Sequence, residues 1–329
     1  MTGTTADPGT PRTAFGRDLV IDRETLRHFL RRTDRHGLIH LGGHLGLLLL
    51  TGTAVWHTAG SPWLIPAMAV HAIVMAFLFA PVHECSHGSA FRTRRLNEAV
   101  YWLVCLIYLV PPTMFRHAHA AHHTWTQVRG QDPDMLPERM TLLDYGIYIS
   151  GYYFWKRNLG WFLRHPLGII DSLQRRYVPD KTVPRIVREA RIILLVYAGI
   201  AALSVATGST APLLLWISPR LLGEPFMRWL RIAEHGECAE TGDLRHNTRT
   251  TDTSRLIRWL FWNMPYHAEH HLCPMVPFHA LGRLHRVVGE RLHPIGRSYP
   301  AVHAEVLGKI SRHGGVTWEN SPGDVGRGG

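Results

Sequence analysis

Three clusters of closely spaced histidines carry most of the potential chemistry in this chain of 329 residues. Residues three and four positions apart lie on one face of an α-helix, so each cluster can turn two or three imidazoles to one side. Neutral imidazole is the commonest metal ligand in proteins and suits zinc, copper, iron and nickel. One four-coordinate zinc ion would leave half of the eight imidazoles unused, so the spacing predicts two metal ions. The clusters are His83 and His87; His119, His122 and His123; and His267, His270 and His271.

Chance is the first alternative, because the chain has 23 histidines and a single histidine in an apolar segment is usually a hydrogen-bonded core residue. Three clusters that each follow an apolar stretch are difficult to explain in that way. His235 lies between the last apolar block and the third cluster and is a ninth candidate ligand. His117 cannot share the helical face of His119 and is a weaker one. We leave His44 and His71 out of the site, because they could hydrogen-bond to each other.

Long apolar blocks alternate with arginine-rich stretches along the chain. A membrane-spanning helix needs about 20 predominantly apolar residues. The first two blocks reach this length, the third is short, and in the fourth Pro219 and Pro225 are expected to interrupt the helix. We therefore expect an all-α membrane protein with two transmembrane helical hairpins, about four spanning helices, and a cytoplasmic helical cap that holds a two-metal site. The blocks are residues 37–57, 62–82, 192–207 and 212–230.

The arginines indicate how the hairpins are oriented. The short connectors 58–61 and 208–211 contain no Lys or Arg, whereas the opposite flanks, such as 23–35 and 92–95, contain many. Lys and Arg accumulate on the cytoplasmic side of a membrane, so both termini and the metal site are predicted to be cytoplasmic, in the cell membrane if the protein is bacterial. This topology signal, with some attraction to anionic lipid head groups, accounts for the net charge of +11. Nucleic acid is not an expected partner, since no binding motif for it is recognisable.

The remaining segments predict one membrane domain between two tails. Residues 1–17 are polar without an apolar core and predict a disordered N-terminal tail. Residues 18–312 form the membrane domain, and residues 313–329 are expected to be a flexible C-terminal tail. The apolar run 98–112 is too short to span a membrane and ends in two prolines, which favours an interfacial or re-entrant segment. The aromatic stretch 145–161 is typical of a membrane–water boundary.

The residues around the histidines carry a family resemblance. In order and spacing, the clusters and their neighbours resemble the integral-membrane fatty acid desaturase and hydroxylase superfamily, in its acyl-lipid branch. The first cluster has the form HxxxH and Arg231 stands one turn before His235, and both features point away from acyl-CoA substrates and toward lipid- or carrier-linked ones. The resemblance rests on HECSHGSAF at 83–91, TQ at 126–127, DPD at 132–134, NMPYHAEHHLCP at 263–274 and VPF at 276–278.

The resemblance implies a di-iron enzyme that uses O2 and removes hydrogen from an unactivated C–H bond. The leading hypothesis is a fatty acyl desaturase that introduces a C=C bond. A hydroxylase or ketolase of a lipid or isoprenoid is the alternative on the same scaffold, and a histidine-rich membrane metal transporter is a remote one. No residue beyond the metal ligands is assigned to catalysis. The implied iron ligands are His83, His87, His119, His122, His123, His235, His267, His270 and His271.

The expected partners follow from what the chain lacks. It has no cysteine pattern for an iron–sulfur cluster and no glycine-rich dinucleotide motif. Electrons are therefore expected from a separate ferredoxin-, rubredoxin- or cytochrome-type donor, which the basic cytoplasmic face could attract. The other expected partners are an acyl-lipid or acyl-carrier substrate and membrane lipids.

Acidic residues near the clusters suggest supporting roles. Metal-bound histidines usually donate their second N–H to a carboxylate or carbonyl group. In the fourth apolar block, Arg220 and Glu224 stand four residues apart, which predicts an ion pair near the membrane boundary. The carboxylates close enough in sequence to support the ligands are Glu84, Asp132, Asp134, Glu234 and Glu269.

Overall fold

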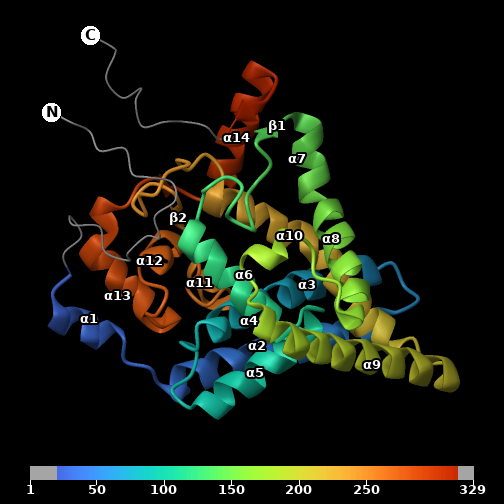
Figure 1. Cartoon of the computed structure of the whole chain (residues 1–329). Coiled ribbons are helices and arrows are strands. Elements are labelled where there is room, and N and C mark those ends of the chain that lie inside the picture. The colour runs from blue at the N-terminus through green and yellow to red at the C-terminus, as the bar shows by residue number, and fades with distance from the viewer. Residues whose placement is uncertain (1–20, 318–329) are drawn as a thin grey trace, which may run out of the picture.

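The computed structural model describes residues 21–317; the predicted tail at 1–17 and the part of the predicted C-terminal tail beyond Thr317 lie outside the described residues. The described chain is mostly helical, as predicted (Figure 1). Its longer helices are α1 Arg23–Phe29, α2 Asp34–Thr58, α3 Leu64–Ala76, α4 Phe79–Ser86, α5 Arg94–Ile107, α6 Pro112–Trp125, α7 Leu142–Ile149, α8 Tyr152–Arg164, α9 Val183–Thr207, α10 Ser218–His235, α11 Arg255–Leu260, α12 His267–Leu272, α13 Phe278–Val288 and α14 Tyr299–His313. Short helical turns lie at His165–Leu167, Gln174–Arg176, Asp180–Thr182, Leu213–Ile217 and Gly289–Arg291.

The apolar helices indicate a membrane protein. Among the described residues, Arg23–Thr58, Leu64–Ser86 and Asp180–Thr207 are each long and apolar enough to cross a membrane. The pair α5 and α6 would make a fourth span, although the chain bends by 95° between them. The segments containing α2 and α9 leave most of their apolar side chains exposed, as helices facing lipid do, whereas Leu64–Ser86 is largely buried. The predicted class and the number of spans agree with this arrangement.

The fourth predicted apolar block packs against one of the candidate spans. Residues 212–230 form a helical turn and most of α10, which is not among the candidate spans of the described chain and packs along α3. Pro219 lies in the first turn of α10, where proline is tolerated, and Pro225 lies inside the helix. The predicted interruption at these prolines is therefore wrong. Gly223 allows the close packing, because a Cβ there would lie 2.4 Å from the carbonyl oxygen of Ala72.

Prolines set the sharp bend between α5 and α6. After α5 ends, Leu109 adopts a left-handed conformation with φ 57°. Pro111 and Pro112 follow, and Pro112 occupies the first turn of α6, where no backbone N–H is needed. The apolar run 98–112 thus turns at its proline end, as predicted, and leads directly into the helix that carries the second histidine cluster.

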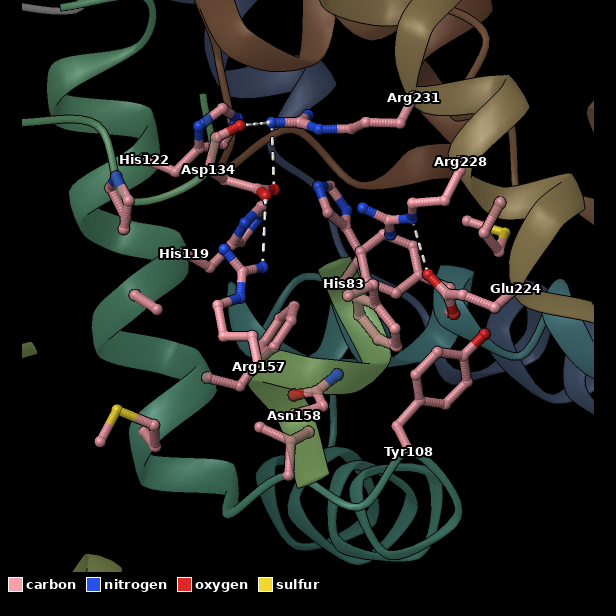
Figure 2. A pocket seen from close by; sticks show the side chains of 18 of the residues that line it. His83, Tyr108, His119, His122, Asp134, Arg157, Asn158, Glu224, Arg228 and Arg231 are labelled. Carbon is pink, nitrogen blue, oxygen red and sulfur yellow. Dashed lines mark hydrogen bonds and ion pairs between the residues drawn. The ribbon is translucent and has the colours of Figure 1, made fainter. Parts of the chain in front are cut away.

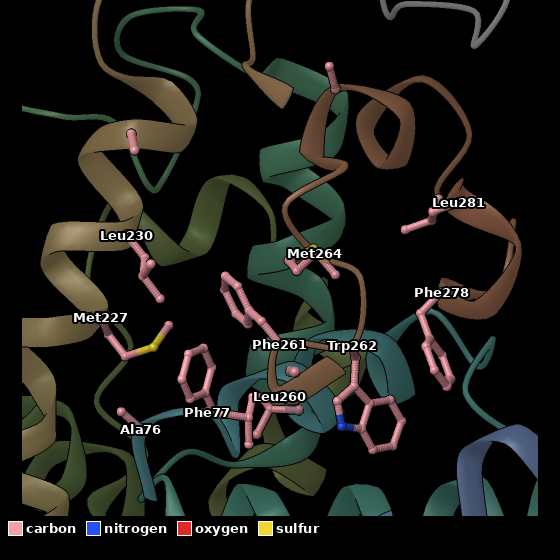
Figure 3. Packing of buried hydrophobic residues seen from close by; sticks show 14 of the residues in the cluster. Ala76, Phe77, Met227, Leu230, Leu260, Phe261, Trp262, Met264, Phe278 and Leu281 are labelled. Atoms are coloured by element: carbon pink, nitrogen blue, oxygen red, sulfur yellow. The ribbon is translucent and has the colours of Figure 1, made fainter. Parts of the chain in front are cut away.

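A buried aromatic core supports the third cluster (Figure 3). Phe77, Phe261 and Trp262 are almost completely buried beneath the turn that joins α11 to α12. Trp262 and Asn263 both have positive φ, a region that non-glycine residues seldom occupy. The Asn263 amide secures this turn by donating to the carbonyl oxygen of Phe278 at 3.1 Å. The core therefore fixes the direction in which α12 leaves the turn.

Two short strand pairs tie distant parts of the chain together. β2 (Thr250–Thr251) pairs in parallel with β3 (Ile295–Gly296). β1 (Arg139–Met140) pairs antiparallel with β4 (Val316–Thr317). The second pairing brings the first residues of the predicted C-terminal tail into the fold.

His44 and His71, which lie inside the first two apolar blocks, contact backbone and hydroxyl groups. His44 Nε2 lies 2.8 Å from the carbonyl oxygen of Val74. His71 lies 2.8 Å from Thr51 Oγ1 and 3.1 Å from the carbonyl oxygen of Leu215. They do not pair with each other, so that expectation is wrong. Both link neighbouring helices and stand outside the metal centre.

Candidate metal centre

Nine histidines converge inside the fold from α4 and its C-terminal cap, α6, the end of α10, and α12. They are the nine that the sequence predicts as ligands, and they form two groups. Within each group, one imidazole nitrogen from every residue lies within 4.8 Å of the others. The five-histidine group consists of His83, His87, His119, His123 and His270, and the four-histidine group of His122, His235, His267 and His271.

Helix geometry explains how each HxxHH motif is divided between the groups. Neighbouring residues of an α-helix point about 100° apart. On α6, His119 and His123 enter the five-histidine group, whereas His122 points into the four-histidine group. On α12 the i, i+4 pair joins the four-histidine group and His270 crosses to the other. Each motif therefore links both groups, whereas we expected each to turn three imidazoles to one side.

In both groups the Nε2 atoms of the imidazoles face one another or have no hydrogen-bond partner. In the four-histidine group, Nε2 of His235 lies 2.8 Å from Nε2 of His267, and Nε2 of His122 and His271 are buried with no hydrogen-bond partner. The five-histidine group has three Nε2–Nε2 separations, of 2.9, 3.1 and 3.1 Å. Buried polar atoms are almost always satisfied in folded proteins. Converging, unsatisfied nitrogen donors therefore fit two bound metal ions.

Burial keeps the imidazoles of α12 neutral. It lowers the pKa of His270 and His271 well below the ordinary value, and the neighbouring imidazoles lower the pKa further. Neutral imidazole is the form that binds a metal ion. The two histidines are therefore in the ligand-competent state at physiological pH.

Asp132 and Thr126, which follow the second cluster in the sequence, orient two imidazoles of the four-histidine group. Asp132 Oδ1 lies 2.8 Å from His122 Nδ1, and Thr126 Oγ1 lies 3.1 Å from His271 Nδ1. Partners of this kind fix the ring orientation and raise the basicity of the ligand nitrogen. The contact of Asp132 was predicted from the sequence. The contact of Thr126 with His271 was not predicted. The only sequence feature that draws attention to Thr126 is the TQ pair at 126–127, which resembles the family.

Glu84 is buried between the five-histidine group and α13. Its Oε1 lies 3.8 Å from His83 Nδ1 and 3.9 Å from His270 Nδ1, which is too far for a hydrogen bond. Its other oxygen accepts from Ser89 Oγ at 2.9 Å and from the backbone N–H of Phe278 at 3.3 Å. Glu84 thus stands close to two imidazoles without pairing with either.

The three other predicted carboxylates make no hydrogen bond to a clustered imidazole. Glu269 lies 2.5 Å from Nδ1 of His285, and this contact raises the pKa of His285. Asp134 pairs with arginines, and Oε1 of Glu234 is buried without a partner. The supporting role that we predicted for these three residues is therefore wrong.

A cavity of about 130 Å³ lies beside the histidines (Figure 2). Phe79, Met114 and Phe115 give it an apolar surface. An apolar ligand in this cavity would lie directly against the candidate metal centre. The histidine wall of the cavity combines imidazoles from both groups, which are His83, His119, His122 and His267.

The opposite wall is built around buried ion pairs on α10. Arg220 Nη1 lies 2.8 Å from Glu224 Oε2, which confirms the predicted ion pair, and Arg228 Nε lies 2.6 Å from Glu224 Oε1. All three side chains are largely inaccessible to solvent. The rings of Tyr108 and Trp155 cover the Arg220 guanidinium at 4.0 and 4.7 Å, which adds cation–π attraction. The cavity-lining residues of this arginine wall are Asp134, Arg157, Glu224, Arg228 and Arg231.

Asp134 links the arginine wall to Asp132, the residue that contacts His122. Its carboxylate lies 3.0 Å from Arg231 and 4.0 Å from Arg157, and its backbone N–H donates to Asp132 at 2.9 Å. Burial raises the pKa of Asp134, but the nearby cations, above all Arg231, outweigh burial and lower it to about 2. Arg157 in the cavity is not predictable from the sequence, because a single arginine at that position is indistinguishable from the many arginines that mark the cytoplasmic side.

Comparison with known proteins identifies the family. The sequence matches the family "Fatty acid desaturase" over residues 60–303, which include all nine histidines. The sphingolipid delta(4)-desaturase/C4-monooxygenase of Rattus norvegicus is 28% identical over 243 residues, which cover 71% of this chain and 69% of that protein. The fatty acid desaturase of Bacillus subtilis (strain 168) is 24% identical over 242 residues, covering 66% and 67% of the two chains. The delta(12) fatty acid desaturase of Mortierella isabellina is 28% identical over 152 residues, covering 41% and 38%. The chain therefore belongs to the fatty acid desaturase family of membrane oxidoreductases.

Proposed function

We propose that the protein is an O2-dependent di-iron desaturase that introduces a C=C bond into a fatty acyl chain linked to a lipid or to a carrier. The observation that carries this proposal is the pair of buried imidazole groups beside one cavity. Family membership supports an oxidoreductase with a lipid substrate. The two irons, the use of O2, the bond that is formed and the head group are the parts that we propose.

Each histidine group would hold one iron ion, because imidazole nitrogen suits iron and each group supplies at least four of them. Two bound irons would supply O2 activation and removal of hydrogen from an unactivated C–H bond. Asp132 and Thr126 would keep the rings of His122 and His271 oriented throughout turnover. No other side chain is needed as an acid, base or nucleophile.

The chain's own residues would bind and align the substrate. Phe79, Met114 and Phe115 would contact the acyl segment and exclude water from the histidine wall. The arginine wall is held in place by its internal ion pairs, so it would keep the reacting segment against the imidazoles. A rigid, narrow cavity of this kind would limit the reaction to one position along the chain.

We further propose that both termini and the metal centre face the cytoplasm, which the distribution of Lys and Arg supports. Electrons would come from a separate ferredoxin-, rubredoxin- or cytochrome-type protein. The form of the first histidine cluster and Arg231 near His235 support an acyl-lipid or carrier-linked substrate over acyl-CoA.

Hydroxylation or ketolation of a lipid or isoprenoid is the second candidate. One relative is named both as a desaturase and as a C4-monooxygenase. Both reactions begin with removal of hydrogen from the same kind of C–H bond, so one site could serve either. Metal transport is a remote third candidate, since transport sites usually lie near the bilayer midplane. Metal uptake into proteoliposomes would support transport.

Lipid mass spectrometry separates these functions. The protein would be expressed in a host together with a ferredoxin and its reductase. A product lighter than its parent by two hydrogens supports desaturation, and one heavier by an oxygen supports hydroxylation. His270→Ala should abolish the product, whereas His117→Ala, a change on α6 outside both groups, should retain it. A product that persists undiminished in His270→Ala would contradict the proposed site.

A further inference from the structure

We propose that a second, basic pocket between α2, α11 and α13 binds the phosphate group of an anionic membrane lipid. The pocket has a volume of about 400 Å³ and shares no lining residue with the cavity beside the histidines. The proposal rests on the membrane placement of α2 and is independent of the reaction. The lining residues that carry it are Arg255, Arg258, Arg283, Arg286, Trp259 and His279.

The pocket carries an excess of positive charge. Of its four arginines, Arg258 pairs with Asp252. Arg255, Arg283 and Arg286 are exposed, and none has an ion-pair partner among residues 21–317. No Asp or Glu lines the pocket. Three uncompensated guanidinium groups around one hollow repel one another, and an anion between them would relieve that repulsion.

Two buried nitrogen atoms of the pocket also lack partners. Nε of Arg258 and Nε2 of His279 are inaccessible to solvent and have no hydrogen-bond partner in the described chain. Burial lowers the pKa of His279 to about 4, with further contributions from His36 and Arg283. Buried polar atoms without partners are uncommon in folded proteins, so they are independent support for a ligand. The positive surroundings indicate that this ligand is an anion.

The pocket lies at the N-terminal end of a candidate membrane span. His40 of α2 lines it, and the ring of His36 stacks on His279 with the centroids 4.3 Å apart. Trp259 packs so closely on α2 that a Cβ at Gly43 would lie 2.5 Å from its ring. His36 and His40 lie about 3 and 9 Å along α2 from its first residue, so this side of the pocket is near the end of the span, where the helix leaves the hydrocarbon. Lipid phosphates lie at that level.

Exposed apolar side chains beside the pocket favour a lipid over free phosphate. Leu38 and Ile39 of α2 are about half exposed next to His40, and Leu256 is 63% exposed next to Arg255. Planar guanidinium groups bind phosphate oxygens in pairs, and tryptophan is typical of the membrane interface. Cations, an interfacial tryptophan and apolar contacts together match the head group and upper acyl chains of an anionic phospholipid.

The test measures which lipids remain bound to the purified full-length protein. The protein is equilibrated in mixed micelles of phosphatidylcholine and phosphatidylglycerol, and the retained lipids are quantified. The wild type should retain phosphatidylglycerol in preference to phosphatidylcholine. One interfacial arginine contributes about fivefold to such binding, so Arg283→Gln/Arg286→Gln should weaken the preference by roughly 10- to 30-fold. Both side chains are exposed, which makes a folding defect in this variant unexpected.

The matched control is Arg188→Gln/Arg312→Gln, which removes the same charge from exposed positions outside the pocket. This control should keep the wild-type preference. An equal loss in both double variants would overturn the proposal in favour of general surface attraction. Retention of phosphatidylglycerol equal to that of phosphatidylcholine by the wild type would overturn it outright. Full displacement by millimolar inorganic phosphate would identify a free-phosphate site and contradict the lipid assignment.

Discussion

The two walls of the cavity bury polar groups in opposite ways (Figure 2). On the arginine wall, the buried Glu224 pairs with Arg220 and Arg228. The partly exposed Asp134 pairs with Arg231 at 3.0 Å and with Arg157 at 4.0 Å, so the charges of this wall are compensated within the protein. On the histidine wall, neutral imidazoles face one another, and Nε2 of His122 and His83 have no partner at all. The buried charges of Arg220, Glu224 and Arg228 are paired within the protein, whereas the imidazoles of the histidine wall face other neutral imidazoles.

This difference distinguishes residues that stabilise the fold from residues that bind a metal ion. Burying ionic groups is favourable only when partners surround them, so a closed set of ion pairs has a structural role. Neutral imidazoles that converge with unsatisfied nitrogen atoms have a cost that the fold does not offset, and a metal ion bound between them would remove that cost. Changes to the histidine wall should therefore affect metal binding and activity, whereas changes to the arginine wall should mainly affect stability.

The largest effect is expected for the histidine wall. His271→Ala removes one imidazole of the four-histidine group, so we expect activity more than about 100-fold below wild type, beyond the usual effect of losing an outer partner. Product formation by mass spectrometry measures this. Activity within a few-fold of wild type would show that His271 is not a ligand.

On the arginine wall, Glu224→Gln leaves two buried guanidinium groups without their carboxylate. We expect a loss of about 3 to 5 kcal/mol in stability, because each arginine is buried and loses its partner. Thermal unfolding in detergent measures the change. The charge swap Arg220→Glu/Glu224→Arg should restore only part of the stability, because Arg228 would then face another arginine. Full restoration would contradict the three-residue arrangement.

Asp132→Asn tests the support of the histidine wall. Asp132 holds Nδ1 of His122, and weakening such a partner typically lowers metal affinity or activity by about 10- to 100-fold. Metal affinity is measured by competition with a chelator. An unchanged affinity would mean that the His122 ring is oriented without Asp132.

Gly223→Ala tests the packing that holds the arginine wall in place. The added Cβ would meet the backbone oxygen of Ala72 at 2.4 Å, so we expect α10 to shift and the protein to lose about 1 to 3 kcal/mol. Gly199→Ala on α9 has open space around it and should be neutral or slightly stabilising. Equal melting temperatures for the two variants would contradict the close packing of α10 on α3.

The smallest effect concerns pH. The pKa of Asp134 is lowered from 3.8 to about 2, so its contribution to stability is fully present above pH 4 and is lost only as pH falls toward 2. Between pH 5 and 8 the difference in melting temperature between wild type and Asp134→Asn should therefore stay constant. A difference that changes across that range would show that Asp134 titrates there.

Features that depend on neighbouring residues could be predicted from the sequence. Side-chain type and helical spacing predict eight of the nine histidines, and His235 follows from its position between the last apolar block and the third cluster. The Arg220–Glu224 pair follows from the separation of the two residues along one helix. The role of the histidines as iron ligands stays a proposal. Burial against a neighbouring helix, as for α10 on α3, and exposure to lipid both select apolar side chains, so composition does not distinguish the two for residues 212–230.

Features that depend on how helices meet could not be predicted. The division of each HxxHH motif between two groups follows from the mutual orientation of α6 and α12. The contact between Thr126 and His271 joins residues 145 positions apart, and the arrival of Arg157 at the cavity depends on the path of α8. In each case the residue type is ordinary and only the tertiary structure gives it a role.

The central claim is that two irons are bound by the two histidine groups. The most direct test is the iron content of the purified protein, measured per chain by mass spectrometry of the metals. The account predicts two irons per chain in the wild type and in His117→Ala, with a clear loss in His122→Ala and in His87→Ala, one change in each group. Two irons retained in both ligand variants, or a different metal at full occupancy in an active wild type, would contradict it.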